Sequence, residues 1–220
     1  MKTIGPLWAA MGLVLISHLA AQESVTTRAA VQKDLSTPKA AAMTFAWAMY
    51  VGDVEMARSA VIGDRQQIQA IEAVCALVVG FDKLTEAMKQ KFGQAEGGLG
   101  SKATTFSPKL EQIERMEVHI AGDNATLGDL DSKQAMRLIR VNGEWKVVMD
   151  SLPGRERSDE VASIAGAVAK IAGDLAQEIN QNKYRSADDA REAFQAKMMA
   201  ALSSRLKTTA PATRPVIPEP

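Results

Sequence analysis

The chain has few of the side chains on which most enzyme and metal chemistry depends. Its 220 residues include one cysteine, two histidines and 5% aromatic residues. A single cysteine excludes an intramolecular disulfide. Cys75 lies in an apolar helical run, which favours a buried, inert thiol over a reactive one. Because His18 belongs to the N-terminal apolar stretch, His119 is the one histidine left, so a metal site with nitrogen and sulfur ligands is not predicted.

The chain also lacks an excess of positive or of negative charge. Lys and Arg number 26, Asp and Glu number 26, and the formal net charge is +0. A neutral chain with few aromatic residues has neither the basic surface nor the stacking side chains of a nucleic-acid binder, so no nucleic-acid partner is expected. The glycines at 97, 98 and 100 fit no phosphate-binding loop. We therefore predict no cofactor.

The N-terminus predicts export. Lys2 is followed by an apolar stretch from Leu7 to Leu19 and by the small residues Ala20 and Ala21. This is the pattern of a signal peptide over residues 1–21, and it is shorter than the ~20 residues of a membrane span. We expect a periplasmic or extracellular protein with no stable membrane span in the mature chain. An uncleaved N-terminal anchor is the alternative.

The next part of the chain predicts helices, after a polar linker over residues 22–36. Thr37 and Pro38 are a helix cap and a first helical residue. A short helix is expected over 54–60. Asp64 and Gln67 form a capping-box pattern before a long helix that reaches residue 92. Gly80, inside this helix, marks a place for a kink or break.

A meander of four antiparallel strands is predicted over residues 112–152. Its strands are expected at 116–120, 125–130, 136–141 and 145–149. Asn142-Gly143 and Gly122-Asp123 stand between apolar runs, and Asn-Gly is the strongest short hairpin signal. Alternation places Met116, Val118 and Ile120 on the face toward the helices, together with Trp145.

Two further helices are predicted as an antiparallel helical hairpin over residues 155–206, with a disordered proline-rich tail at 207–220. The first is expected over 158–180, and Ser186 begins the second. The first carries a row of apolar residues at heptad-like spacing: Val161, Ile164, Val168, Ile171 and Leu175. We consider three covers for this row: the helix at 187–206, the outer face of the sheet, or the same row on a second copy. A protein partner, most simply a second copy, is therefore expected at helices 158–206.

The order of elements resembles the NTF2-like (cystatin-like, SnoaL-like) α+β superfamily. The segments Thr37–Asp53, Ala121–Leu127 and Leu138–Asp150 are similar to its first helix and later strands. The resemblance covers residues 37–152 and implies an α+β domain in which N-terminal helices pack on a curved antiparallel sheet to form a cone. In the enzymes of this superfamily, an Asp or a His/Asp set lies inside the cone. No motif transfers those residues to this chain.

Three residues are candidates for chemistry. His119 shares parity with Glu117, opposite the apolar face, so a solvated histidine is favoured over a general base. Asp129 shares parity with Leu127 and would be a base if buried, although a turn-capping role is favoured. Asp150 ends the last strand, where a surface carboxylate is expected.

Three functions remain open from the sequence. The first is an exported, non-catalytic domain that binds a small apolar ligand or a protein partner. The second is a small-molecule isomerase or lyase with a carboxylate base in the cone. The third is a structural or assembly protein that acts through its C-terminal helices. A hollow interior favours the first two, and an interior filled by the protein's own side chains favours the third.

Overall fold

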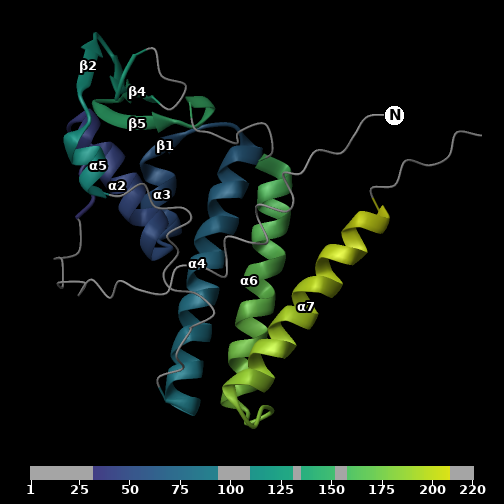
Figure 1. Ribbon diagram of the computed structural model, residues 1–220. Helices are drawn as coiled ribbons and strands as arrows, with labels where there is room; N and C mark the ends of the chain where they lie inside the picture. Colours follow the sequence, from purple (N-terminus) through teal and green to yellow (C-terminus); the bar gives the residue numbers. More distant parts are fainter. Residues whose placement is uncertain (1–31, 94–109, 131–134, 152–157, 209–220) are drawn as a thin grey trace, which may run out of the picture. The chain divides into compact units, whose positions relative to one another are not determined.

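The computed structural model describes residues 32–93, 110–130, 135–151 and 158–208. In these residues the chain forms six α-helices and a five-stranded mixed sheet, which confirms the predicted α+β class (Figure 1). The elements are α2 (Pro38–Val51), α3 (Val54–Ser59), β1 (Val61–Ile62), α4 (Arg65–Phe92), α5 (Leu110–Arg115), β2 (Val118–Ala121), β3 (Asn124–Leu127), β4 (Met136–Val141), β5 (Glu144–Val148), the 3-10 turn η1 (Met149–Ser151), α6 (Ser158–Asn180) and α7 (Ala187–Thr208). The predicted signal peptide and the segment at 209–220 lie outside the described residues.

The predicted helix starts are confirmed by their caps. The Thr37 hydroxyl accepts a hydrogen bond from the Ala40 N–H at 3.1 Å, and Pro38 is the first residue of α2. At the start of α4, Asp64 and Gln67 form the reciprocal capping box, with N···O distances of 2.8 and 2.9 Å. Each cap satisfies amide groups that the first helical turn leaves without partners.

The sheet has the strand order β1-β5-β4-β3-β2. The antiparallel meander from β2 to β5 is as predicted. Its tight turn has positive φ at Asn142 (54°) and at Gly143 (84°), the backbone conformation that makes Asn-Gly a hairpin signal. The parallel strand β1 was not predicted: Val61 pairs with Val147, and two residues are too few to produce a recognisable alternation.

The start of the meander differs from the prediction. Helix α5 occupies residues up to Arg115, so β2 begins at Val118 rather than at Met116. Ile120 has the parity of the covered face but is 60% exposed. The reason is its position: β2 is the last strand of the sheet, and Ile120 is close to the hairpin turn, opposite the small Ala125.

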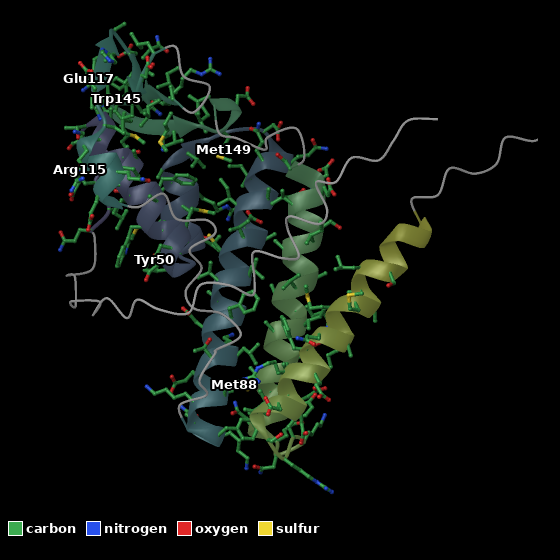
Figure 2. All side chains as sticks on the ribbon, in the orientation of Figure 1. Tyr50, Met88, Arg115, Glu117, Trp145 and Met149 are labelled. Atoms are coloured by element: carbon green, nitrogen blue, oxygen red, sulfur yellow. The ribbon has the colours of Figure 1, made fainter. Side chains whose placement is uncertain are left out.

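One face of the sheet is covered by α2 and α5, and this is where the first hydrophobic core forms. Trp145 lies on this face and is 2% exposed (Figure 2). The core side chains of the sheet are Val61, Ala125, Leu127, Met136, Leu138, Trp145 and Val147, and those of the helices include Ala41, Ala42, Phe45 and Ile113. Leu35, inside the predicted linker, is also buried, and its carbonyl accepts a hydrogen bond from the Trp145 N–H at 2.8 Å.

Helices α4 and α6 lie side by side and run parallel (Figure 1). Their starts are joined by Gln66 Nε2, which donates to Asp159 Oδ2 at 3.1 Å. Near their ends, Lys91 Nζ donates to Asn182 Oδ1. The second hydrophobic core forms along this pair, so α4 contributes to both cores.

The main neighbour of α6 is α4, which was not among the three predicted covers, while the predicted cover α7 adds Ala190 and Phe194 to the same core. Five buried residues of α6 repeat at three and four residues, and Ala176 is buried beside them; the five are Ala165, Val168, Ala172, Leu175 and Ile179. Ile164 and Ile171, which belong to the predicted row, are half-buried. The contact row is thus displaced by one residue toward the alanines, because small side chains let the two helices approach closely.

Gly80 shows how close this approach is, and it does not break α4. The helix is continuous from Arg65 to Phe92. A Cβ atom built on Gly80 would lie 2.9 Å from the carbonyl oxygen of Ala169, which is backbone of α6. Glycine is therefore required here by the neighbouring helix rather than by a kink.

Helix α7 follows α6 through a turn at residues 181–186 and diverges from it toward its own C-terminal end (Figure 1). Its hydroxyl cap is as predicted, since the Ser186 Oγ accepts from the Asp189 N–H at 3.1 Å. Phe194 packs against Phe81 of α4, with ring centroids 5.9 Å apart. Met88, labelled in Figure 2, belongs to the same second core.

Candidate functional site

The three candidate residues do not form one site. His119 lies on β2 and faces away from the covered side, since it pairs with Thr126. Its Nε2 atom lies 3.8 Å from Glu117 Oε2, and its side chain is 36% exposed. Asp129 is exposed and follows the end of β3. Asp150 is in η1 after β5, and two strands of the sheet separate it from the strand of His119.

Asp150 belongs to a polar network that the sequence does not reveal. Gln67, which is 6% exposed, donates from Nε2 to Asp150 Oδ1 at 2.6 Å. The Oε1 atom of the same side chain accepts from the Asp64 N–H. The network joins the start of α4 to the end of β5, two positions 83 residues apart in the sequence. Its geometry identifies Asp150 as a partner of a buried amide that fixes the sheet to α4.

Replacing Gln67 by alanine is expected to lower the free energy of unfolding by about 1–2 kcal/mol, because both hydrogen bonds of a buried amide are lost. Gln66 is the matched control, since its contact with Asp159 is exposed. Gln66→Ala should cost about 0.5 kcal/mol or less. Urea unfolding followed by circular dichroism measures both, and equal losses would contradict the structural role of Gln67.

Cys75 is buried, as predicted. It is the only cysteine of the chain, so its thiol has no disulfide partner within the chain. Burial raises the pKa of the Cys75 thiol to about 11, and the negative charges of Asp53 and Glu72 contribute to the same effect. The Sγ atom lies 3.8 Å from the Met49 sulfur. A thiol with this pKa is almost entirely protonated near neutral pH and is therefore a poor nucleophile.

Groups that bind metals are not gathered in the part of the chain that the structure describes. Within residues 32–93, 110–130, 135–151 and 158–208, no three His, Cys, Asp or Glu side chains come close enough together to hold a metal ion. Among the described helices, none combines the length and the apolar composition that a bilayer crossing requires.

The covered face of the sheet, where the resemblance places a ligand cone, is packed with the protein's own side chains. Leu127 and Val147 are completely buried, Leu138 is 1% exposed, and Ile113 of α5 is completely buried against them. Four alanines of α2 (Ala41, Ala42, Ala46 and Ala48) are completely buried as well. Small side chains at these positions let α2 lie close to the sheet, which fills the space that a ligand would need.

A shallow groove of about 590 Å³ lies instead between α4 and α6. Its rim is polar and carries charges of both signs, from Lys83, Glu86 and Gln90 on α4 and from Asp174, Gln177 and Asn180 on α6. Ala87, Gly173 and Ala176 complete the lining. The groove belongs to the helical part of the protein, where α4 and α7 also expose the apolar side chains of Val79 (36% exposed) and Met199 (64% exposed).

A polar cluster at Glu178 joins α6 to α7. Its Oε2 atom accepts from Lys197 Nζ at 2.7 Å and from the Tyr184 hydroxyl at 2.6 Å. Lys183 Nζ lies 3.9 Å from Oε1. The hydrogen bonds from Lys197 and Tyr184 hold the pKa of Glu178 below its usual range. Burial and the Glu178 carboxylate together raise the pKa of Tyr184 to about 12.

Because of this cluster, the contribution of Glu178 to the free energy of unfolding depends on pH. Because its pKa is depressed in the folded state, the contribution is present above the ordinary glutamate pKa of ~4.3 and is lost as the pH falls through the lower folded value. Glu178→Gln should cost about 0.5–1 kcal/mol at pH 7. The difference from the unchanged protein should shrink in urea unfolding at pH 3. A difference that is constant with pH would contradict the ionic role.

Comparison with protein families, with characterised proteins and with solved structures finds no match to this chain.

Proposed function

We propose that this chain is a non-catalytic protein that acts through protein–protein contacts of its long helices α4, α6 and α7. The observation that supports this best is the filled interior. The side chains that would line a ligand cone, such as Leu127, Leu138 and Val147, are buried against α2 and α5. This packing disfavours both a bound apolar ligand and an isomerase or lyase with a carboxylate base in the cone.

The positions of the candidate catalytic residues support the same choice. Asp129 and Asp150 are exposed, and Asp150 accepts a hydrogen bond from a buried amide that it helps to place. A general base in a cone needs a carboxylate that is buried next to the substrate. The partner we favour is a second copy of the chain, because the half-buried residues Ile164 and Ile171 leave apolar surface on α6.

The proposal includes export, with a signal peptide over residues 1–21, and the NTF2-like resemblance of residues 37–152. Export is supported by the apolar stretch from Leu7 to Leu19 and the small residues after it. Mass spectrometry of the protein recovered from its native cell envelope tests it, and an intact Met1 would show that the segment is retained as an anchor.

Sedimentation of the chain at tens of micromolar tests the proposed contacts. We expect association that is lost in the variant Ile164→Lys with Ile171→Lys. The matched control is Ile120→Lys, which places the same charge on an apolar residue that is 60% exposed on the sheet edge and should keep the association. A monomeric chain that binds an apolar dye such as Nile red at one saturable site would favour the ligand-binding function instead.

A further inference from the structure

Helix α7 contributes few side chains to the second core. Ala190 is completely buried and Phe194 is 8% exposed, and both belong to the second core. Lys197 is bonded to Glu178. Met198 is the last residue of α7 that packs on this core among the side chains described, and Met199 is 64% exposed. Because it buries few side chains, α7 can leave its place more easily than α6 can.

The turn before α7 ends α6 with a Schellman motif. The Lys183 N–H donates to the Glu178 carbonyl at 3.1 Å, and the Asn182 N–H donates to the Ile179 carbonyl at 2.9 Å. Asn182 has a φ of 61°, in the left-handed region that favours glycine. Its side chain accepts a hydrogen bond from Lys91. The turn is therefore well bonded, but it holds a residue with a Cβ atom in a conformation that only glycine adopts without cost.

The same turn is also able to become helical. Residues 181–186 (Gln-Asn-Lys-Tyr-Arg-Ser) include neither glycine nor proline. If they continued α6 into α7, helical backbone hydrogen bonds would replace those of the Schellman motif and of the Ser186 cap. Asn182 would then leave its left-handed conformation. A continuous helix would thus give the backbone a second well-bonded arrangement, beside the bent one that the structure shows.

We propose that α7 is exchanged between two copies of this chain. In the exchanged dimer, α6 and α7 form one continuous helix, and each α7 occupies on the other copy the place that it has here on its own. The structure already shows the contacts that the α7 of a second copy would make. That helix would bring the same Phe194 to Phe81 and the same Lys197 to Glu178. Exchange of an identical element is a low-cost route to a symmetric dimer.

This inference rests on the proposed function and deepens it, since it names a second copy as the partner and α7 as the contact. It also predicts that protein concentration decides between the two arrangements. The contacts that hold α7 are the same in both, so the balance depends on the turn and on the entropy of bringing two copies together. We expect a monomer at low concentration and a growing share of dimer above it.

A charge exchange at the Glu178–Lys197 pair tests the proposal. Glu178→Lys and Lys197→Glu each place two like charges face to face within one chain. If α7 is exchanged, a mixture of the two variants forms a heterodimer in which both pairs are again of opposite charge. If α7 stays on its own chain, mixing repairs neither chain. The double variant, with both changes in one chain, is the control, since it restores the pair in either arrangement.

The readout is sedimentation and native mass spectrometry of the two variants, mixed at equal concentration and separately. We expect the dissociation constant of the heterodimer to be at least tenfold lower than that of either homodimer. A wild-type chain that associates while the mixture shows no preference for the heterodimer overturns the exchange and leaves the proposed helix contacts standing. A wild-type chain that remains monomeric at hundreds of micromolar overturns both.

The turn offers a second test that does not depend on the charged pair. Asn182→Gly removes the cost of the left-handed conformation from the bent turn and should raise the dimer dissociation constant about tenfold, because two such turns must straighten to form one dimer. Asn182→Ala adds to that cost and should lower the constant. Equal constants for the two variants would overturn the proposal, since the turn would then not be the hinge.

Discussion

Trp145→Ala is expected to lower the free energy of unfolding by about 3–5 kcal/mol, the range for a large aromatic side chain in a core. The ring is 2% exposed and lies in the first core. The guanidinium of Arg140 lies over it, 5.2 Å from the ring centroid, and this contact with the ring is lost as well. Alanine would leave a cavity that the other side chains of the first core fill only in part.

Trp47 provides the matched control for this prediction. It is half-buried on α2, with its ring centroid 5.7 Å from that of Tyr50. Trp47→Ala should cost less than half as much as Trp145→Ala, because less of its surface leaves water when the chain folds. Urea unfolding measures both variants. A loss below about 1 kcal/mol at Trp145 would mean that the other face of β5 is the buried one.

The features that the sequence predicts correctly are those set by neighbouring residues. The Thr37 and Asp64 caps each depend on a side chain and an amide three residues away. The turn at Asn142-Gly143 depends on two adjacent residues with positive φ. Such features need no knowledge of the rest of the chain, so the helix starts and the order of the meander can be read directly.

The features that the sequence does not predict depend on residues far apart in the chain. Strand β1 exists because Val61 pairs with Val147, and its two residues show no pattern alone. The contact row on α6 could not be found from the large side chains, because it includes Ala165 and Ala172. Its partner α4 also precedes strands β2 to β5 in the sequence, whereas α6 follows them. Small residues carry a weak hydrophobic signal but permit the closest approach of two helices.

The same reason applies to the candidate residues. Parity along β2 predicts correctly that His119 faces away from the core. Asp129 lies beyond the end of β3, where alternation no longer applies, and it is exposed. The link between Asp150 and Gln67 joins two elements 83 residues apart. The residues around Gln67 predict its capping bond to Asp64, but they give no sign of its second contact, with Asp150.

Gly80→Ala is expected to destabilise the protein by about 1–3 kcal/mol, although alanine is the better helix former. In an isolated helix the change would be favourable by about 1 kcal/mol, because glycine has more conformational freedom to lose. Here the new Cβ atom would lie 2.9 Å from the Ala169 carbonyl oxygen and 3.4 Å from the Ala169 Cα atom. Both are backbone atoms, so α4 and α6 must move apart along their shared core. Gly80→Leu should cost about 3 kcal/mol, at the upper end of the range for overpacked cores.

Two glycines of α6 separate the packing effect from helix propensity. Cβ atoms built on Gly166 and on Gly173 meet nothing within 4 Å, so no neighbouring element opposes them. Gly166→Ala and Gly173→Ala should therefore each stabilise the protein by up to about 1 kcal/mol. Opposite signs at Gly80 and at these two positions, measured by urea unfolding, are what close packing of parallel helices requires. If Gly80→Ala were stabilising as well, α4 and α6 would be farther apart than the contact between Gly80 and Ala169 indicates, and the second core would be held chiefly by α7.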